Sequence, residues 1–533
     1  MKRKLRRKAS DPSRQKQRLD AAVEPLSANR QVEATWKYHN ATKHSYASVR
    51  TNPHVLDWDN KPLQFKIYPT LEVIRLPRAA HQTGVSALSA LTSTGLKNSS
   101  GALDLEALAQ ILFLSAGITK SKRYAGGETF FRAAACTGAL YEIELYLVTG
   151  DLPGLDAGIY HFGVAEFGLR KLREGDYRQL LAAATSKQRA VAEAPLTVVC
   201  TGTYWRNAWK YQARTYRHFG WDNGTILANM LAISSALGLQ AKVVAGFADD
   251  EVNRLLDLDT RREVTFSLVA IGSGGSAKPG SKPEMAPLGL PVLPLSKMEI
   301  DYPLMREMHA ASSLATPEEV IAWAGKTPRR KAPKPQSKTI PLMIPAEGEL
   351  ASDTIEEVIL RRGSTRVFAQ RPITLEQLSV ILDRSTRGIP ADFLDPTGSR
   401  LNDLYLIIND VEGLQTGAYY YQAETQQLEL LRHGNFRKMS GYLGLEQQLP
   451  ADASVAIFFL ADLRLILERF GNRGYRAAQL EAGMLGGKLY LAAYALRLGA
   501  SGLTFYDDDV VRFFSPHAEG KSAIFLVTIG KSA

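Results

Sequence analysis

Apolar and polar residues follow two different periods along this chain, which predicts both helices and strands. Helical spacing predicts helices at 103–116, 226–237, 354–360 and from Thr374 onward. The run 226–237 is apolar nearly all round and should be buried, and Thr374 is a good N-cap with Gln377 three residues later. Short apolar runs predict strands at 141–148, 159–162, 196–201, 264–271, 404–408, 418–421 and 454–460. Helices and strands mixed in this order indicate an α+β fold.

A long repeat relates the two halves of the chain. At a constant offset of 259, Arg214, Tyr216, Arg217 and Gly224 correspond to Arg473, Tyr475, Arg476 and Gly483. The apolar tails 263–272 and 521–530 match at an offset of 258. A register held this long indicates two copies of one domain, which we expect to face each other as a pseudo-dimer within one chain.

The repeat and the composition together predict the domain boundaries. Residues 1–35 are expected to form a disordered basic tail, and residues 36–272 the first domain. Residues 273–350 contain a segment rich in Gly, Ser and Pro and a basic Pro-rich segment, so a linker is expected, with a helix or two near 305–324. Residues 351–533 are expected to form the second domain.

The bulk composition narrows the class of protein. The net charge of +11 is uneven, since residues 1–18 hold nine Lys or Arg and one Asp. A solubilising tail accounts for this charge better than a nucleic-acid arm, so we expect no nucleic-acid partner. No apolar run reaches about 18 residues, which predicts no membrane-spanning helix. Two cysteines, Cys136 and Cys200, give neither a disulfide framework nor a zinc pattern, and we expect a cytoplasmic protein without a metal site.

Two stretches carry candidate binding chemistry. Arg362, Ser364 and Arg366 alternate just beyond a predicted helix, where two guanidinium forks and a hydroxyl suit a phosphate; a solvated surface patch explains them as well. The stretch from Arg132 through Cys136 and Gly138 is rich in small residues and runs into a strand. It could let a flat ligand approach the backbone, or it could simply be a tight strand entry.

Lys210 and Tyr211 are the candidate catalytic pair. They could supply a base and an acid if burial lowers the pKa of the lysine; alternatively both side chains lie along a helix surface. The second copy has Arg469 and Phe470 at these positions. Because phenylalanine cannot transfer a proton, the second copy cannot repeat this chemistry.

Taken together, these motifs resemble the nitroreductase-like flavoproteins, and more closely the thiazoline/oxazoline oxidases, which are the dehydrogenases of azole-forming peptide pathways. The resemblance covers residues 36–272 and 352–530. It is carried by Arg-x-Ser-x-Arg at 362–366, by Gly-Ala-Leu-Tyr at 138–141, by Lys-Tyr-x-x-Arg-x-Tyr-Arg at 210–217 and by the helix glycines Gly224 and Gly483. Cys136 stands where the family usually has serine, and Ala135 where it has proline.

The resemblance implies FMN bound between two nitroreductase-like domains. It implies a cofactor site of Arg362, Ser364, Arg366, Arg132, Cys136, Gly138 and Gly483, with Lys210 as base and Tyr211 as partner acid. The intact motifs are complementary between the halves, so one working site and one decayed site are expected. The implied function is dehydrogenation of an azoline-type small molecule or peptide made by a partner biosynthetic enzyme. Alternatives are an NAD(P)H-dependent reductase of nitro compounds or quinones, and a non-catalytic scaffold for such a partner.

Overall fold

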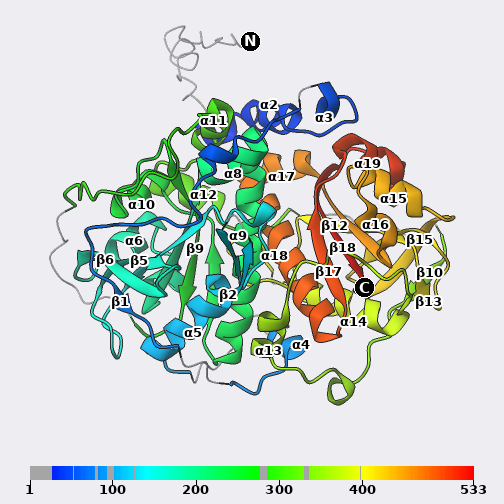
Figure 1. Ribbon diagram of the computed structural model, residues 1–533, viewed down its shortest axis with the longest axis horizontal. Coiled ribbons are helices and arrows are strands. Elements are labelled where there is room, and N and C mark those ends of the chain that lie inside the picture. Colours follow the sequence, from blue (N-terminus) through cyan, green and yellow to red (C-terminus); the bar gives the residue numbers. More distant parts are fainter. Residues whose placement is uncertain are drawn as a thin grey trace, which may run out of the picture.

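Two seven-stranded antiparallel sheets form the two halves of the molecule (Figure 1). The computed structural model describes residues 27–51, 53–78, 82–92, 101–124, 127–275, 285–328, 335, 337–396 and 398–533. In order across the first sheet, the strands are β1 (Ile74–Arg75), β6 (Gly168–Glu174), β5 (Gly158–Gly163), β4 (Ile143–Thr149), β7 (Leu196–Thr203), β9 (Glu263–Ile271) and β8 (Ala241–Val244). In the second sheet they are β10 (Thr339–Pro341), β15 (Gln427–His433), β14 (Gly417–Gln422), β12 (Asn402–Ile408), β16 (Val455–Ala461), β18 (Ser522–Gly530) and β17 (Gly499–Leu503). The strand order is the same in both, so the tandem α+β fold is confirmed.

Two long helices, α9 (Thr215–Ala236) and α18 (Arg473–Ala495), lie side by side at the seam between the halves (Figure 1). They approach so closely that a Cβ atom at Gly224 would lie 2.5 Å from the carbonyl carbon of Gly483. Only glycine allows two helix backbones to meet at this distance. Buried apolar residues of both helices belong to one core that continues through both halves, and a smaller separate cluster lies within the first half.

The predicted strands and helices are confirmed, with shifts of a few residues at their ends, except that the helix expected at 226–237 already begins at Thr215. The first predicted helix is α5 (Leu105–Ala116), and the buried one is the C-terminal part of α9. In the second half they are α13 (Ile355–Arg361) and α14 (Leu375–Thr386), the latter with the predicted capping box of Thr374 and Gln377. Among the elements that the sequence patterns missed are the hairpin of β2 (Ile118–Tyr124) and β3 (Gly127–Arg132), the edge strands β1, β8, β10 and β17, and the neighbouring strands β6 and β15.

The expected tail and linker boundaries need correction. Residues 1–26 lie outside the described residues, but 28–30 form a 3-10 helix that packs on the second half, where Asn29 donates to Phe470 O (3.1 Å). The next helix, α2 (Glu33–Ala41), contacts the helix α11 (Pro303–Ala311). Helix α11 lies within the expected linker, together with α12 (Pro317–Trp323) and strand β10.

The helices α2 and α11 are counterparts in the two copies, related by an offset of 270. Arg217 donates to His39 O (2.7 Å) and to Thr42 Oγ1 (3.1 Å). Its equivalent Arg476 donates in the same way to His309 O (3.0 Å) and to Ser312 Oγ (2.8 Å). The second copy therefore starts near residue 303 and not at 351, because the burial of α11 requires an interior that a free linker does not have. The remaining joint is 273–302, of which 276–284 lie outside the described residues.

Each half also holds a carboxylate between two arginines of the other half. Arg214, just before α9, and Arg217 on α9 donate to Asp507 at 3.1 and 2.6 Å, where α19 (Asp507–Phe514) begins. In the mirror arrangement Arg473 and Arg476 on α18 donate to Asp249 at 2.5 and 2.7 Å, at the start of α10 (Asp249–Leu255). These reciprocal pairs are what an isologous interface of a twofold dimer contains, here within one chain. None of the described helices is long and apolar enough to cross a membrane.

Candidate active site at the seam

A cavity of about 410 Å³ lies at the seam of the two halves. The first half contributes the loop 135–138 before β4, the end of α8 (Tyr204–Tyr211) and the N-terminal part of α9. The second half contributes the segment after α13, strand β17 and Tyr490 of α18. The volume is in the range of small-molecule and cofactor sites. A ligand in this cavity would touch both copies of the repeat.

One end of the cavity is cationic. Arg366 and Lys210, one from each half, both line it, and neither has a carboxylate partner among the described residues. Ser364 also lines this region, with its hydroxyl 3.2 Å from Tyr490 Oη. Two free cations and a hydroxyl converging from two chain segments form a suitable site for a phosphate group.

The predicted catalytic pair lies beside this end. Partial burial lowers the pKa of Lys210, and the nearby charges of Arg366 and Lys61 lower it further. Burial also raises the pKa of Tyr211, and the acidic groups Asp222, Cys136 and Glu142 raise it further. A larger fraction of Lys210 than of a free lysine is therefore neutral and able to accept a proton, while the tyrosine stays protonated and can donate. The Lys210 ammonium lies 5.3 Å from the centre of the Tyr211 ring.

The small-residue loop forms the wall opposite the second half. Gly138 has φ +65°, and a Cβ atom there would lie 2.8 Å from Tyr211 Oη, so glycine is needed both for the backbone and for the tyrosine. Behind the loop, Asp222 on α9 accepts from the Thr137 N–H (3.0 Å) and hydroxyl (2.8 Å). This carboxylate fixes the loop to the central helix.

Cys136, Glu142 and Asp222 bring their ligand atoms within 4.8 Å of one another. The Cys136 thiol lies 3.2 Å from Asp222 Oδ2. Burial and the two carboxyl groups raise the pKa of the thiol well above its usual value, and burial raises the pKa of Glu142 and Asp222. A thiol in this setting stays protonated, so Cys136 is a hydrogen-bond donor and not a nucleophile.

Three of the predicted cofactor residues do not line the cavity. Gly483 lies at the crossing of the central helices, where it serves packing. The buried Arg362 guanidinium donates to Ala133 O (2.8 Å) and Arg132 O (3.0 Å), so it joins the halves behind the loop. Arg132 donates to Gln64 O (2.6 Å) and lies over the Tyr141 ring at 4.7 Å. The structure does bring together Cys136, Gly138, Ser364, Arg366, Lys210 and Tyr211.

Several lining residues were not predicted. They include His44, His218, Trp221 and Thr504, and the Thr504 hydroxyl is buried with no hydrogen-bond partner in the part of the chain that is described. His218 Nδ1 lies 2.7 Å from Asn207 Oδ1, and the ring is 4.7 Å from that of Tyr211. His218 and Trp221 lie together on α9, within a few residues of the Lys-Tyr motif, and this closeness in sequence could have indicated them. Nothing in the sequence indicated His44, because it belongs to a segment far from the motif.

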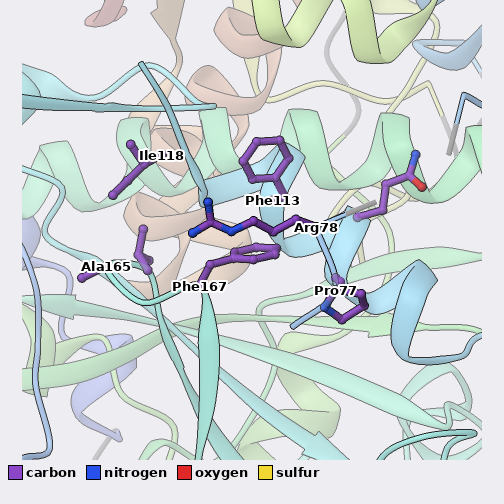
Figure 2. A pocket seen from close by; sticks show the side chains of 9 residues that line it. Pro77, Arg78, Phe113, Ile118, Ala165 and Phe167 are labelled. Carbon is purple, nitrogen blue, oxygen red and sulfur yellow. The ribbon is translucent and has the colours of Figure 1, made fainter. Parts of the chain in front are cut away.

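A second cavity, of about 300 Å³, opens within the first half near α5 (Figure 2). Its walls are mainly apolar; the Phe113 and Phe167 rings contact each other at 5.6 Å, and the Arg78 guanidinium lies 5.9 Å from the centre of the Phe167 ring (Figure 2). It contains no acid–base pair, and it does not reach the seam residues. The seam cavity is therefore the candidate active site.

Comparison with known proteins agrees with this architecture. The profile described as "Nitroreductase family" matches residues 103–273 and 359–531, which is more than half of the chain. The solved structure of a "putative nitroreductase" from Anabaena variabilis has a TM-score of 0.76 and 26% sequence identity, and the match covers 94% of this chain and 99% of that one. The tandem arrangement of the two halves is thus common to both.

Two curated relatives match about a third of the chain. A "Putative nitroreductase" of Methanocaldococcus jannaschii is 27% identical over 173 residues, which are 32% of this chain and 82% of that protein. The trifolitoxin-processing protein TfxB of Rhizobium leguminosarum bv. trifolii is 29% identical over 182 residues, which are 32% of this chain and 47% of TfxB.

Proposed function

The chain belongs to the nitroreductase family, and from that premise we propose that it is an FMN-dependent oxidoreductase with a single working site at the seam. The observation that carries this proposal is the complementarity of the cavity walls. The first half supplies Lys210, Tyr211 and the loop at Gly138, and the second supplies Ser364 and Arg366. Neither half has both sets of groups.

The residues present suit FMN. Arg366 and Ser364 would hold the phosphate. The loop at Gly138 and the orphaned hydroxyl of Thr504 would face the polar edge of a flat ring. FMN, when bound, accepts the two electrons of an oxidation and passes them to dioxygen.

Lys210 and Tyr211 would handle the proton of the reaction. In a dehydrogenation, one C–H bond of the substrate loses a proton and the neighbouring position loses a hydride, and a double bond forms between them. The lowered pKa of Lys210 favours it as the acceptor of that proton. Tyr211 keeps its proton and would donate a hydrogen bond to the carbonyl or ring nitrogen that gains charge.

We propose an azoline-type heterocycle, within a peptide or derived from an amino acid, as the substrate. Two observations support this choice: the intact Lys210–Tyr211 pair, and the relative TfxB, whose name places it in the processing of trifolitoxin. A partner enzyme that forms the azoline ring would supply the substrate. The cytoplasm, where such enzymes and a reduced Cys136 are found together, is the compartment we propose.

A visible spectrum and a product assay test the proposal. The purified protein is expected to be yellow and to release one FMN per chain. With an azoline model peptide and air, the product is expected to be 2 Da lighter and to carry an azole. Arg366→Ala should lose the flavin, whereas Lys210→Ala should keep the flavin and lose turnover. Normal turnover by Lys210→Ala would refute the assigned base.

A second candidate is an NAD(P)H-dependent reductase of nitro compounds or quinones. It is favoured by the names of the Methanocaldococcus and Anabaena proteins. Oxidation of NADPH in the presence of a nitroarene, together with no change in the azoline peptide, would establish this candidate in place of the first.

A further inference from the structure

The pseudo-twofold axis relates the seam cavity to a second location, where a mirror site should lie. At the offsets of 259 and 258, Lys210, Tyr211 and Thr504 correspond to Arg469, Phe470 and Gly246. The reciprocal arginine–aspartate pairs at Asp507 and Asp249 show that the same relation holds in space. The surroundings of Phe470 and Gly246 can therefore be compared directly with the cavity.

Trp323, at the end of α12, fills the mirror site. Its side chain is fully buried, and its ring lies 5.3 Å from that of Phe470 and 6.3 Å from that of Phe393. A Cβ atom at Gly246 would lie 3.0 Å from Trp323 Cε3, so the indole rests on the backbone of this glycine. In the open cavity, the corresponding position carries the Thr504 side chain. A flat aromatic ring thus lies between the counterparts of Tyr211 and Thr504.

In the mirror site, the end of α12 is bound by Arg469, the counterpart of the lysine that is free in the open cavity. The Arg469 guanidinium, equivalent to the unpaired Lys210 ammonium, donates to Ala324 O (2.8 Å), Lys326 O (3.2 Å) and Ala322 O (3.3 Å). These carbonyls belong to the end of α12 and the residues after it, so the cation binds the segment that carries the indole. A cation poised for an anion in one site stabilises a helix end in the other.

The chain after Trp323 also closes the loop of the mirror site. Thr327 donates through its hydroxyl to Phe393 O (3.0 Å) and accepts from the Asp395 N–H (2.8 Å). Asp395 corresponds to Cys136 at the offset of 259. Nearby, Asp392 accepts from the N–H groups of Ala245 (2.9 Å) and Gly246 (2.8 Å). The backbone donors next to the ring are thus satisfied by the protein itself.

The equivalent segment of the first half explains why the other site is open. The offset is 270 at α2 and α11 and 266 at the equivalent strands β1 and β10, so the counterpart of Trp323 lies within 53–57, where every residue except the half-buried Leu56 is exposed. This segment packs on the outside of α8, where His54 Nε2 lies 2.7 Å from Trp209 O. In the second copy the Trp323 ring therefore occupies the site, whereas the equivalent segment of the first copy runs outside its site and leaves it open.

We propose that Trp323 is an internal ligand of a latent second site, and that this site takes an uncharged planar arene of the size of indole once the side chain is removed. The indole N–H has no acceptor among the described residues, so the ring is held by packing and not by a polar contact. The proposal rests on the pseudo-twofold relation and the packing of Trp323, and holds whether or not a flavin binds the open cavity.

The test is whether free indole binds to Trp323→Ala, measured by titration calorimetry and by thermal unfolding. We expect saturable one-to-one binding and a rise in Tm with indole, whereas the wild type shows neither, since an apolar cavity left by a deleted side chain accepts a matching ring. Trp323→Phe is the matched control; it retains an aromatic ring and should not bind indole.

A second variant, Trp323→Leu, keeps the test decisive if Trp323→Ala folds poorly. Trp323→Leu leaves a smaller hollow, for which benzene is the probe. Recovery of folded Trp323→Ala only in the presence of indole would also support the proposal. Absence of saturable binding of indole to folded Trp323→Ala, or of benzene to Trp323→Leu where the alanine variant does not fold, would overturn it. Loss of flavin chemistry in the wild type would refute the proposed function and leave this result unaffected.

Discussion

The carboxylate of Asp507 holds the two halves together, and replacing it with asparagine tests this directly. In the folded protein its oxygens accept from Arg217 (2.6 Å), Arg214 (3.1 Å) and the His44 N–H (2.8 Å). Burial alone would raise the pKa of Asp507, but the two guanidinium groups hold it well below its usual range. Asp507→Asn keeps the shape and leaves two buried cations without a counter-charge.

The expected loss is about 3–5 kcal/mol, the usual cost of breaking a buried ion pair by removing one partner. For 533 residues the entropy of unfolding is about 1.1 kcal/mol/K, at about 2.1 cal/mol/K per residue. If the chain unfolds as one unit, as its continuous core suggests, the Tm should fall by about 3–5 °C. If one half unfolds first, the shift should be roughly twice as large, because half the entropy is involved.

Thermal unfolding followed by circular dichroism measures this shift, and the chain provides two matched variants. Asp249→Asn breaks the mirror pair at Arg473 and Arg476, so it should lower the Tm by a similar amount. Only Asp507→Asn should also reduce turnover, because it loosens His44 in the cavity. Asp508→Asn is the control, since its contact with Lys43 is exposed. A Tm for Asp507→Asn equal to that of Asp508→Asn would refute the role of this clamp.

Three further changes have defined outcomes. Gly483→Ala should unfold the chain or lower its Tm by more than either aspartate variant, because the new Cβ would meet the α9 backbone at 2.5 Å; a wild-type melting curve would contradict the helix contact. Gly138→Ala should displace the Tyr211 hydroxyl, which lies 2.8 Å from the new Cβ, and lower kcat at least about tenfold while the protein stays folded; steady-state kinetics decide it. Glu142→Gln should stabilise the protein at high pH. Burial, and then Asp222, raise the pKa of Glu142, so the wild type loses stability as pH rises above about 4.3 and through the raised value. The Tm gain of the variant should be larger at pH 8 than at pH 5; a larger gain at pH 5 would contradict the raised pKa of Glu142.

The part of the site that sequence could predict is the part that lies within a few residues of a motif. The stretches at Lys210 and at Gly138 are each continuous in sequence. Their residue types and spacing therefore already indicate a base, an acid and a tight approach to the backbone. Arg362 was misplaced, because alternation along an extended segment cannot tell which arginine faces a ligand and which binds the neighbouring loop. The difference depends on the position of Ala133, 229 residues away.

The true start of the second copy was also beyond the sequence. The helices α2 and α11 share His39 with His309 but few other residues, and α11 is surrounded by Gly- and Pro-rich chain typical of a linker. What relates the two helices is the set of carbonyl and hydroxyl groups that they offer to Arg217 and Arg476. Backbone acceptors leave no trace in the residue types, so this equivalence appears only when the chain is folded.

The sequence by itself determined that two copies of one α+β domain are joined, that their helices carry glycines and arginines in the same register, and that one copy keeps the Lys-Tyr pair. These features are local or repeated, so periodicity and spacing record them. The tertiary structure decided which site is open. Of the two equivalent sites, one is filled because Trp323 packs against Phe470, 147 residues away, whereas the equivalent segment 53–57 of the other copy is largely exposed. Packing between distant segments depends on the shape of both partners, and no pattern along one of them contains that information.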